Sequence, residues 1–105
     1  MKSIIKRIKK HEGFRATVYQ CTEGYDTIGY GFAIKDLVLD KDIADLMLER
    51  KLKDLEKKIA SRFEWFENSP EIIKDAVTDM CYQMGVSGFS KFKKTIYYLE
   101  TEQYE

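Results

Sequence analysis

One stretch of the chain, residues 12–31, carries the side chains whose types and spacing could do chemistry. Glu12 stands where helix-forming residues give way to strand-forming ones, directly before Gly13. A carboxyl at such a junction can act as a general acid, because apolar surroundings would let it keep its proton near neutral pH. Eight residues separate Glu12 from Cys21, and five separate Cys21 from Thr27. Taken by itself, a glutamate at this place is more often a solvated charge at a helix end, so both interpretations stay open.

The spacing and the surrounding residues resemble the signature of the phage lysozymes (endolysins), a family of glycoside hydrolases. That signature is glutamate, eight residues, aspartate or cysteine, five residues and threonine, set within Glu-Gly and Thr-Ile-Gly-x-Gly. A second block, Met80 to Gly85 followed by Gly88 and Phe89, is similar to the family's Gln-Met-Gly segment at a helix end. The resemblance covers nearly the whole chain, because the two blocks stand in the family's order and a long helix is expected between them.

The resemblance implies hydrolysis of the β-1,4 bond between N-acetylmuramic acid and N-acetylglucosamine in peptidoglycan, with inversion at the anomeric carbon and lysis of the bacterial cell wall. It matches Glu12 to the acid and Thr27 to a hydroxyl that positions water. Two such groups stand about 6.5–9.5 Å apart in inverting enzymes. Cys21 stands where many members have aspartate. A free thiol is only about 3% ionised at pH 7, so Cys21 acts either as a thiolate or sterically.

Asp26 is another carboxylate in this stretch. Strand alternation directs it to the face opposite Thr27, unless a bulge shifts the phase. The resemblance also matches five positions to substrate binding: Glu23 and Gln83, and more loosely Ala33, Tyr82 and Thr95. Each of these could equally be a turn residue, a core side chain or a polar group on a helix surface. No metal or cofactor is expected, since two cysteines are too few for a zinc site of their own.

The elements that must position these residues indicate an α+β fold. We expect a short first helix with Ser3 as its cap and Gly13 as its end, followed by a small antiparallel sheet. The later elements are expected as a long helix at about 41–60, a helix from Ser69-Pro70 to Gly85, and a last helix after Ser90. The interpretation is a single lysozyme-like domain over residues 1–105. About 12–60 would form the sheet lobe and connecting helix, and 1–11 with 61–105 the helical lobe.

Composition excludes several other classes of function. Eighteen basic and eighteen acidic residues give a net charge of zero, which argues against a dedicated nucleic-acid binder. The longest apolar run, Ile96–Leu99, is too short to span a bilayer. Residues 1–7 are basic but lack the apolar stretch of a secretory signal. We therefore expect a protein of the host cytoplasm that acts on the cell wall after release.

Family members continue with helices that complete the second lobe, so the resemblance implies a chain that is shortened at its C-terminal end. The first and last helices would then lack a cover for their apolar faces, which are formed by Ile4, Ile5, Ile8, Phe92, Ile96 and Leu99. We expect these faces to pair in a homo-oligomer through residues 1–10 and 89–104. The alternative is a weakly active or inactive lysozyme-like fragment that binds the cell wall or self-associates.

Overall fold

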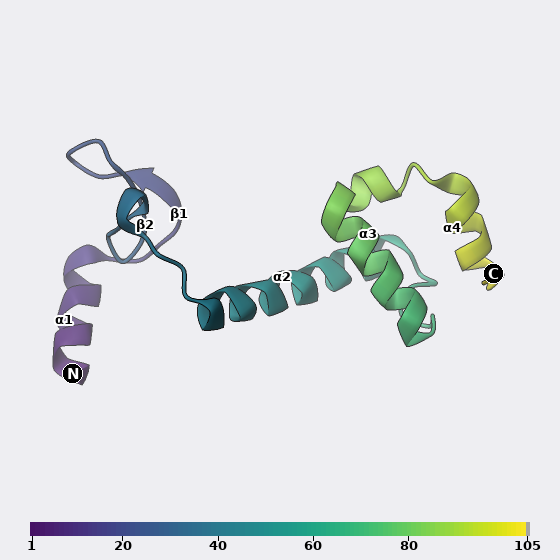
Figure 1. Ribbon diagram of the computed structural model, residues 1–105, viewed down its shortest axis with the longest axis horizontal. Helices are drawn as coiled ribbons and strands as arrows, with labels where there is room; N and C mark the ends of the chain where they lie inside the picture. Colours follow the sequence, from purple (N-terminus) through teal and green to yellow (C-terminus); the bar gives the residue numbers. More distant parts are fainter. Residues whose placement is uncertain (105) are drawn as a thin grey trace. The chain divides into compact units, whose positions relative to one another are not determined.

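The computed structural model describes residues 1–104, in which a helix is followed by a small sheet and then by further helices (Figure 1). This confirms the α+β class. The chain divides into two compact units, Met1–Asp40 and Lys41–Glu105. The assignment of residues 1–11 to a helical lobe, and of the whole chain to one domain, stays a prediction.

The first unit begins with helix α1, Lys2–Glu12. Gly13 ends it as predicted: its φ of 69° leaves the helical region, and its N–H donates to the carbonyl of Lys9 at 2.9 Å. The expected cap was wrong, because Ser3 lies inside the helix and Met1 stands at the cap position without a side-chain hydrogen bond. Glu12 is therefore the last residue of α1, and the position of the helix end determines the position of its side chain.

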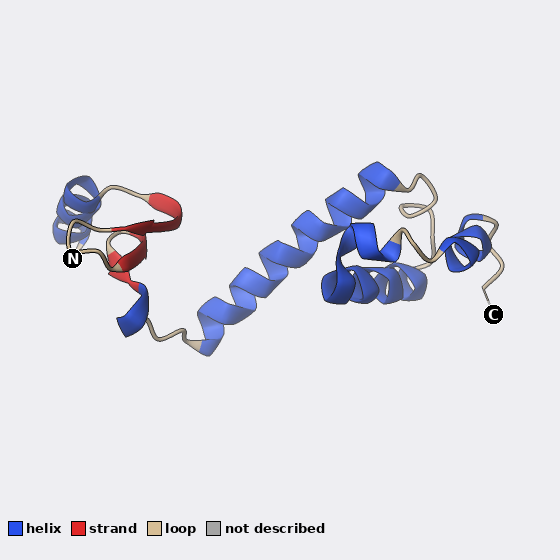
Figure 2. Ribbon diagram, turned by 90° about the horizontal axis from the view of Figure 1, so that it is seen from above, coloured by secondary structure: helices blue, strands red, loops and turns tan. Residues whose placement is uncertain are grey.

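Three short antiparallel strands follow, in the order β1-β2-β3 (Figure 2). Their bounds are β1 Arg15–Gln20, β2 Asp26–Gly29 and β3 Phe32–Ala33, and a 3-10 helix, Ile34–Asp36, comes next. The register pairs Thr27 of the central strand with Tyr19 on one side and Ala33 on the other, and it shifts between Arg15 and Tyr19. Strands on both sides of β2 leave Thr27 only 4% exposed.

The second unit consists of α2 (Lys41–Arg62), α3 (Glu71–Phe89) and α4 (Lys93–Glu100). Helices α2 and α3 pack against each other. Their helical spacing brings apolar side chains to one side, which is why Val77 and Cys81, four residues apart, both enter the core. The buried core consists of Ile59, Phe66, Val77, Cys81 and Phe89.

The helix boundaries of this unit differ from expectation at two places. Pro70, and not Ser69, is at the cap of α3, and the Ser69 hydroxyl donates instead to the carbonyl of Trp65 at 2.8 Å. Gly85 leaves the helical region as predicted, with a φ of 79°, but the helix resumes after it and ends at Phe89. The segment after Gly85 thereby brings Phe89 into the core.

The last helix is less exposed than the sequence suggested. Ile96 and Leu99 of α4 are half-buried and pack against the core of the second unit, while Phe92 remains 45% exposed. The apolar face of α1 is open, with Ile4, Ile5 and Ile8 between 43% and 48% exposed. Among the described helices, none has the length and apolar character that crossing a bilayer requires.

Candidate active site

The side chain of Glu12 projects from the last residue of α1 toward the turn between β2 and β3. A Cβ placed on Gly31 in that turn would overlap the Oε2 atom of Glu12, which shows how closely the carboxyl approaches the backbone there. The glutamate is otherwise exposed. One side of the carboxyl is thus against protein, while the other is open to solvent and to a ligand.

Thr27 presents its hydroxyl from the middle strand of the sheet. Its Oγ1 donates a hydrogen bond of 2.9 Å to the carbonyl of Tyr25, which fixes the direction of the side chain. The oxygen keeps lone pairs that can accept a hydrogen bond from water. Asp26, its neighbour in the strand, is exposed whereas Thr27 is buried, as strand alternation predicts.

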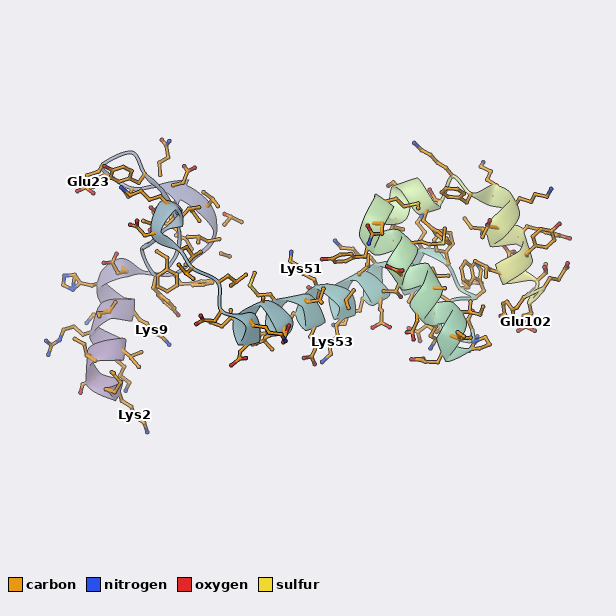
Figure 3. The ribbon with its side chains drawn as sticks, viewed as in Figure 1. Lys2, Lys9, Glu23, Lys51, Lys53 and Glu102 are labelled. Carbon is orange, nitrogen blue, oxygen red and sulfur yellow. The ribbon has the colours of Figure 1, made fainter. Side chains whose placement is uncertain are left out.

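Cys21 follows the end of β1 and is half-buried. Its backbone N–H donates to the same Tyr25 carbonyl at 2.9 Å, so the backbone of Cys21 and the hydroxyl of Thr27 share one hydrogen-bond acceptor. The sulfur lies 4.0 Å from Oε2 of Glu23, to which the neutral thiol donates. Figure 3 shows Glu23 at the tip of the loop between β1 and β2.

Hydrogen bonds in this loop favour the ionised form of Cys21. The backbone N–H of Tyr25 contributes most, followed by that of Glu23, and together they hold the pKa of Cys21 below its ordinary value. The Thr27 hydroxyl acts in the same direction, whereas partial burial and the charge of Glu23 oppose it. The hydroxyl has one proton, so it is given either to the Tyr25 carbonyl or to the thiolate. The loop can therefore stabilise a negative charge at position 21.

Two of the predicted binding residues, Glu23 and Ala33, lie in the first unit with Glu12, Cys21 and Thr27. Ala33 is paired with Thr27 across the sheet, and Glu23 faces Cys21. The first unit thus brings together the three proposed catalytic residues and two of the proposed contacts. Because the fold alone does not test their roles, these roles stay predictions.

The other predicted contacts are in the second unit. Tyr82 and Gln83 of α3 line one groove of about 400 Å³, together with Leu48 and Leu52 of α2. Thr95 of α4 lines a different pocket. The structure therefore brings Tyr82 and Gln83 together but does not join Thr95 to them.

Several features of these sites are not evident from the sequence spacing. The carbonyl of Tyr25, the contact of Gly31 with Glu12, and a buried Thr78 hydroxyl without a hydrogen-bond partner all depend on the three-dimensional arrangement. Thr78 lines the same groove as Gln83. The Gly29-x-Gly31 pattern is typical of backbone that approaches another group closely, but it does not identify Glu12 as that group. Across residues 1–104, no three His, Cys, Asp or Glu side chains are grouped so as to hold a metal ion.

Comparison with known proteins identifies the family of the chain. The family model described as phage lysozyme matches residues 9–105, so the chain belongs to the phage lysozyme family. A curated relative is the pre-baseplate central spike protein Gp5 of Enterobacteria phage T4, which is 30% identical over 121 aligned residues.

That alignment takes in 86% of this chain but 20% of the relative, so the chain spans about a fifth of the relative's length. The aligned region is also longer than the whole 105-residue chain. The relative must therefore have residues inside the matched region for which this chain has no counterpart. The identity supports membership of the family and no assignment of the relative's assembly role to this chain.

The loop electrostatics lead to a prediction about Glu23→Gln. Removing the carboxylate that faces Cys21 is expected to lower the pKa of Cys21 further, since that charge disfavours the thiolate. The rate of alkylation by iodoacetamide, followed by mass spectrometry, should then rise at a lower pH than in the unchanged chain. The effect should weaken at high salt, because the pair is exposed.

Cys81 provides an internal reference in the same experiment. It is buried, and burial raises its pKa, so it should react slowly in both proteins. Glu67→Gln, which removes an exposed charge in the second unit, should leave the Cys21 profile unchanged. A Cys21 profile that moves to higher pH in Glu23→Gln would contradict the assignment of causes.

Proposed function

We propose that this protein is a muramidase that hydrolyses the β-1,4 bond between N-acetylmuramic acid and N-acetylglucosamine and so lyses bacterial cell walls. Membership of the phage lysozyme family supports the substrate class. The observation that carries the proposal is the pairing of Thr27 and Cys21 on the Tyr25 carbonyl, in the unit that also holds Glu12. This arrangement offers a proton donor, a hydroxyl for water and a site for negative charge.

In the proposed reaction Glu12 gives its proton to the glycosidic oxygen as the bond from that oxygen to the anomeric carbon breaks. Thr27 accepts a hydrogen bond from a water molecule on the opposite face of the sugar. The oxygen of this water bonds to the anomeric carbon, and its proton passes to the Cys21 thiolate or to solvent. Inversion follows, because the water attacks from the side opposite the departing sugar.

The proposed binding residues offer groups that suit a glycan in each unit. Glu23 and Ala33 belong to the first unit. Tyr82 and Gln83 line a groove of the second unit that is also lined by two leucine side chains. A half-exposed tyrosine ring and an amide suit a sugar, which has apolar faces and many hydroxyl groups. Thr95 is the proposed contact that stands apart from this groove.

Glu12→Gln tests the acid. The amide keeps the size of the side chain but cannot protonate the leaving oxygen, so lysis of purified cell walls, followed by turbidity, should fall by about 10²–10⁴-fold. Circular dichroism should show an unchanged fold, since Glu12 is exposed. Glu67→Gln, also exposed, is the matched control and should keep full lysis. Equal lysis by the two variants would remove Glu12 from the mechanism.

If the protein without substitutions cosediments with cell walls but does not clear them, the result favours the alternative. That alternative is a lysozyme-like fragment that binds the wall and hydrolyses it poorly. Release of reducing sugar from soluble glycan separates the two. Only a hydrolase produces new reducing ends, and the chemistry of those ends identifies the bond that is cleaved.

Cys21→Asp and Cys21→Ala together test the role of charge at position 21. At pH 6 the aspartate is ionised and a thiol is less so, and Cys21→Asp should therefore equal or exceed the unchanged chain in lysis. Cys21→Ala should be at least about tenfold slower, because it has no ionisable group. The advantage of aspartate should shrink as the pH rises and Cys21 ionises. If alanine lyses as fast as cysteine at every pH, position 21 has no catalytic role.

We also propose that copies of the chain pair through residues 1–10 and 89–104, with the open apolar stripe of α1 on one side and the exposed tyrosine rings of α4 on the other. The stripe of α1 is flanked by basic residues, among them Lys2 and Lys9 (Figure 3), whereas the end of α4 and the segment after it are acidic, with Glu100 and Glu102. Opposite charges beside apolar surface favour association of the two faces.

Light scattering measures this association directly. The unchanged chain should be a dimer or larger, and Ile8→Asp in the exposed stripe should shift it to monomer, because a charge would be placed in the contact. Ile72→Asp, at a side chain 77% exposed outside these faces, should not. A monomeric unchanged chain at high concentration and low salt would refute the pairing.

A further inference from the structure

The turn that joins β2 to β3 lies directly against the carboxyl of Glu12. A Cβ added to Gly31 would overlap Oε2 and would stand 2.8 Å from Cδ and 3.3 Å from Cγ of Glu12. Separations under 3.0 Å essentially never occur for real Cβ atoms. The carboxyl therefore occupies the space that any side chain at position 31 would take.

Contacts beside Gly31 tie the turn to the end of α1. The ring of Tyr30 packs on the ring of Phe14, with centroids 5.4 Å apart, and the Nζ of Lys9 lies 5.4 Å from the centroid of Tyr30. Lys9 and Phe14 flank Glu12 in the sequence. The backbone at Gly31 is consequently held to the same segment that carries Glu12, and it cannot withdraw without breaking these contacts.

An exposed glutamate has three rotatable bonds and many conformations. The wall formed by Gly31 closes one side of this space and leaves the solvent side open. We infer that Gly31 is a positioning residue for the acid: its missing side chain admits the Glu12 carboxyl, and its backbone limits the directions in which the proton donor can point. This inference rests on the proposed role of Glu12.

Backbone strain has to be separated from this steric effect. Gly31 has a φ of 76°, a conformation that side-chain-bearing residues rarely adopt, so Gly31→Ala is strained at any such position. Gly85 provides the matched control, because its φ is 79° and an added Cβ would meet nothing within 4 Å. Alanine is strained by a positive φ at both positions, while only Gly31→Ala displaces Glu12.

The first experiment compares cell-wall lysis by Gly31→Ala and Gly85→Ala. Displacing the acid by about 1 Å can cost on the order of 100-fold in rate, and this loss is expected for Gly31→Ala. Gly85→Ala should stay within about threefold of the unchanged chain. Equal losses in the two variants would overturn the inference.

The second experiment does not depend on activity. Urea unfolding is measured for Gly31→Ala in the unchanged chain and in a Glu12→Ala background, where the carboxyl is absent. Gly31→Ala should raise the unfolding equilibrium constant about twofold more when Glu12 is present, because only then must a carboxyl move aside, and the end of an exposed side chain does so at low cost. Equal effects in both backgrounds would refute the contact.

If Gly31→Ala does not fold, the same pair of backgrounds still decides. Recovery of folding by adding Glu12→Ala supports the inference. If the chain stays unfolded, backbone strain at Gly31 is the cause, and Gly31→Asn, which tolerates a positive φ better, replaces the alanine variant in both backgrounds; equal effects of Gly31→Asn in the two then contradict the inference. If the effects of Gly31→Ala and Glu12→Ala on unfolding are coupled but the protein lyses no cell walls, the contact is supported and the proposed function is rejected. The two claims can therefore fail separately.

Discussion

A single backbone carbonyl, that of Tyr25, organises the proposed site. It accepts one hydrogen bond from the N–H of Cys21 and another from the hydroxyl of Thr27, each 2.9 Å long. The first closes the loop between β1 and β2, and the second directs a side chain of the central strand. Two residues that are six apart in sequence are thereby held at one point. The spacing between cysteine and threonine in the signature is thus a consequence of one tight loop with one shared acceptor.

The first unit achieves this order with little buried apolar surface. Thr27 is the one buried residue of Met1–Asp40, whereas the second unit has a core of five buried apolar side chains. The positions of Glu12 and Thr27 consequently depend on backbone pairing, the glycine turn and aromatic contacts such as Phe14 with Tyr30. Each such contact contributes about 1 kcal/mol or less. Geometry in this unit is therefore sensitive to single changes in its turns.

Features set by neighbouring residues could be predicted from the sequence, and those set by distant contacts could not. Gly13 ends α1 and the segment before Tyr25 turns, because both depend on local backbone preferences. Ser69 has the right residue type for a helix cap, yet its hydroxyl donates to the backbone carbonyl of Trp65. The position of Trp65 depends in turn on its packing against the core. The helical spacing of Ile96 and Leu99 identified an apolar face but not its packing partner. In the site, the residue types and spacing were accessible, whereas the shared carbonyl and the contact of Gly31 with Glu12 required the structure.

The loop geometry also explains how cysteine can stand where related sequences have aspartate. The backbone N–H groups of Tyr25 and Glu23 point at the side chain of residue 21 and favour its charged form, and they would serve a carboxylate oxygen as readily as a sulfur. The loop therefore specifies an anion and leaves its chemical identity open. The Glu23 carboxylate works against this preference, since it lies near the sulfur and raises the pKa of Cys21. A positively charged partner that paired with Glu23 would offset part of that opposition, so binding of such a partner at Glu23 and ionisation of Cys21 would favour each other.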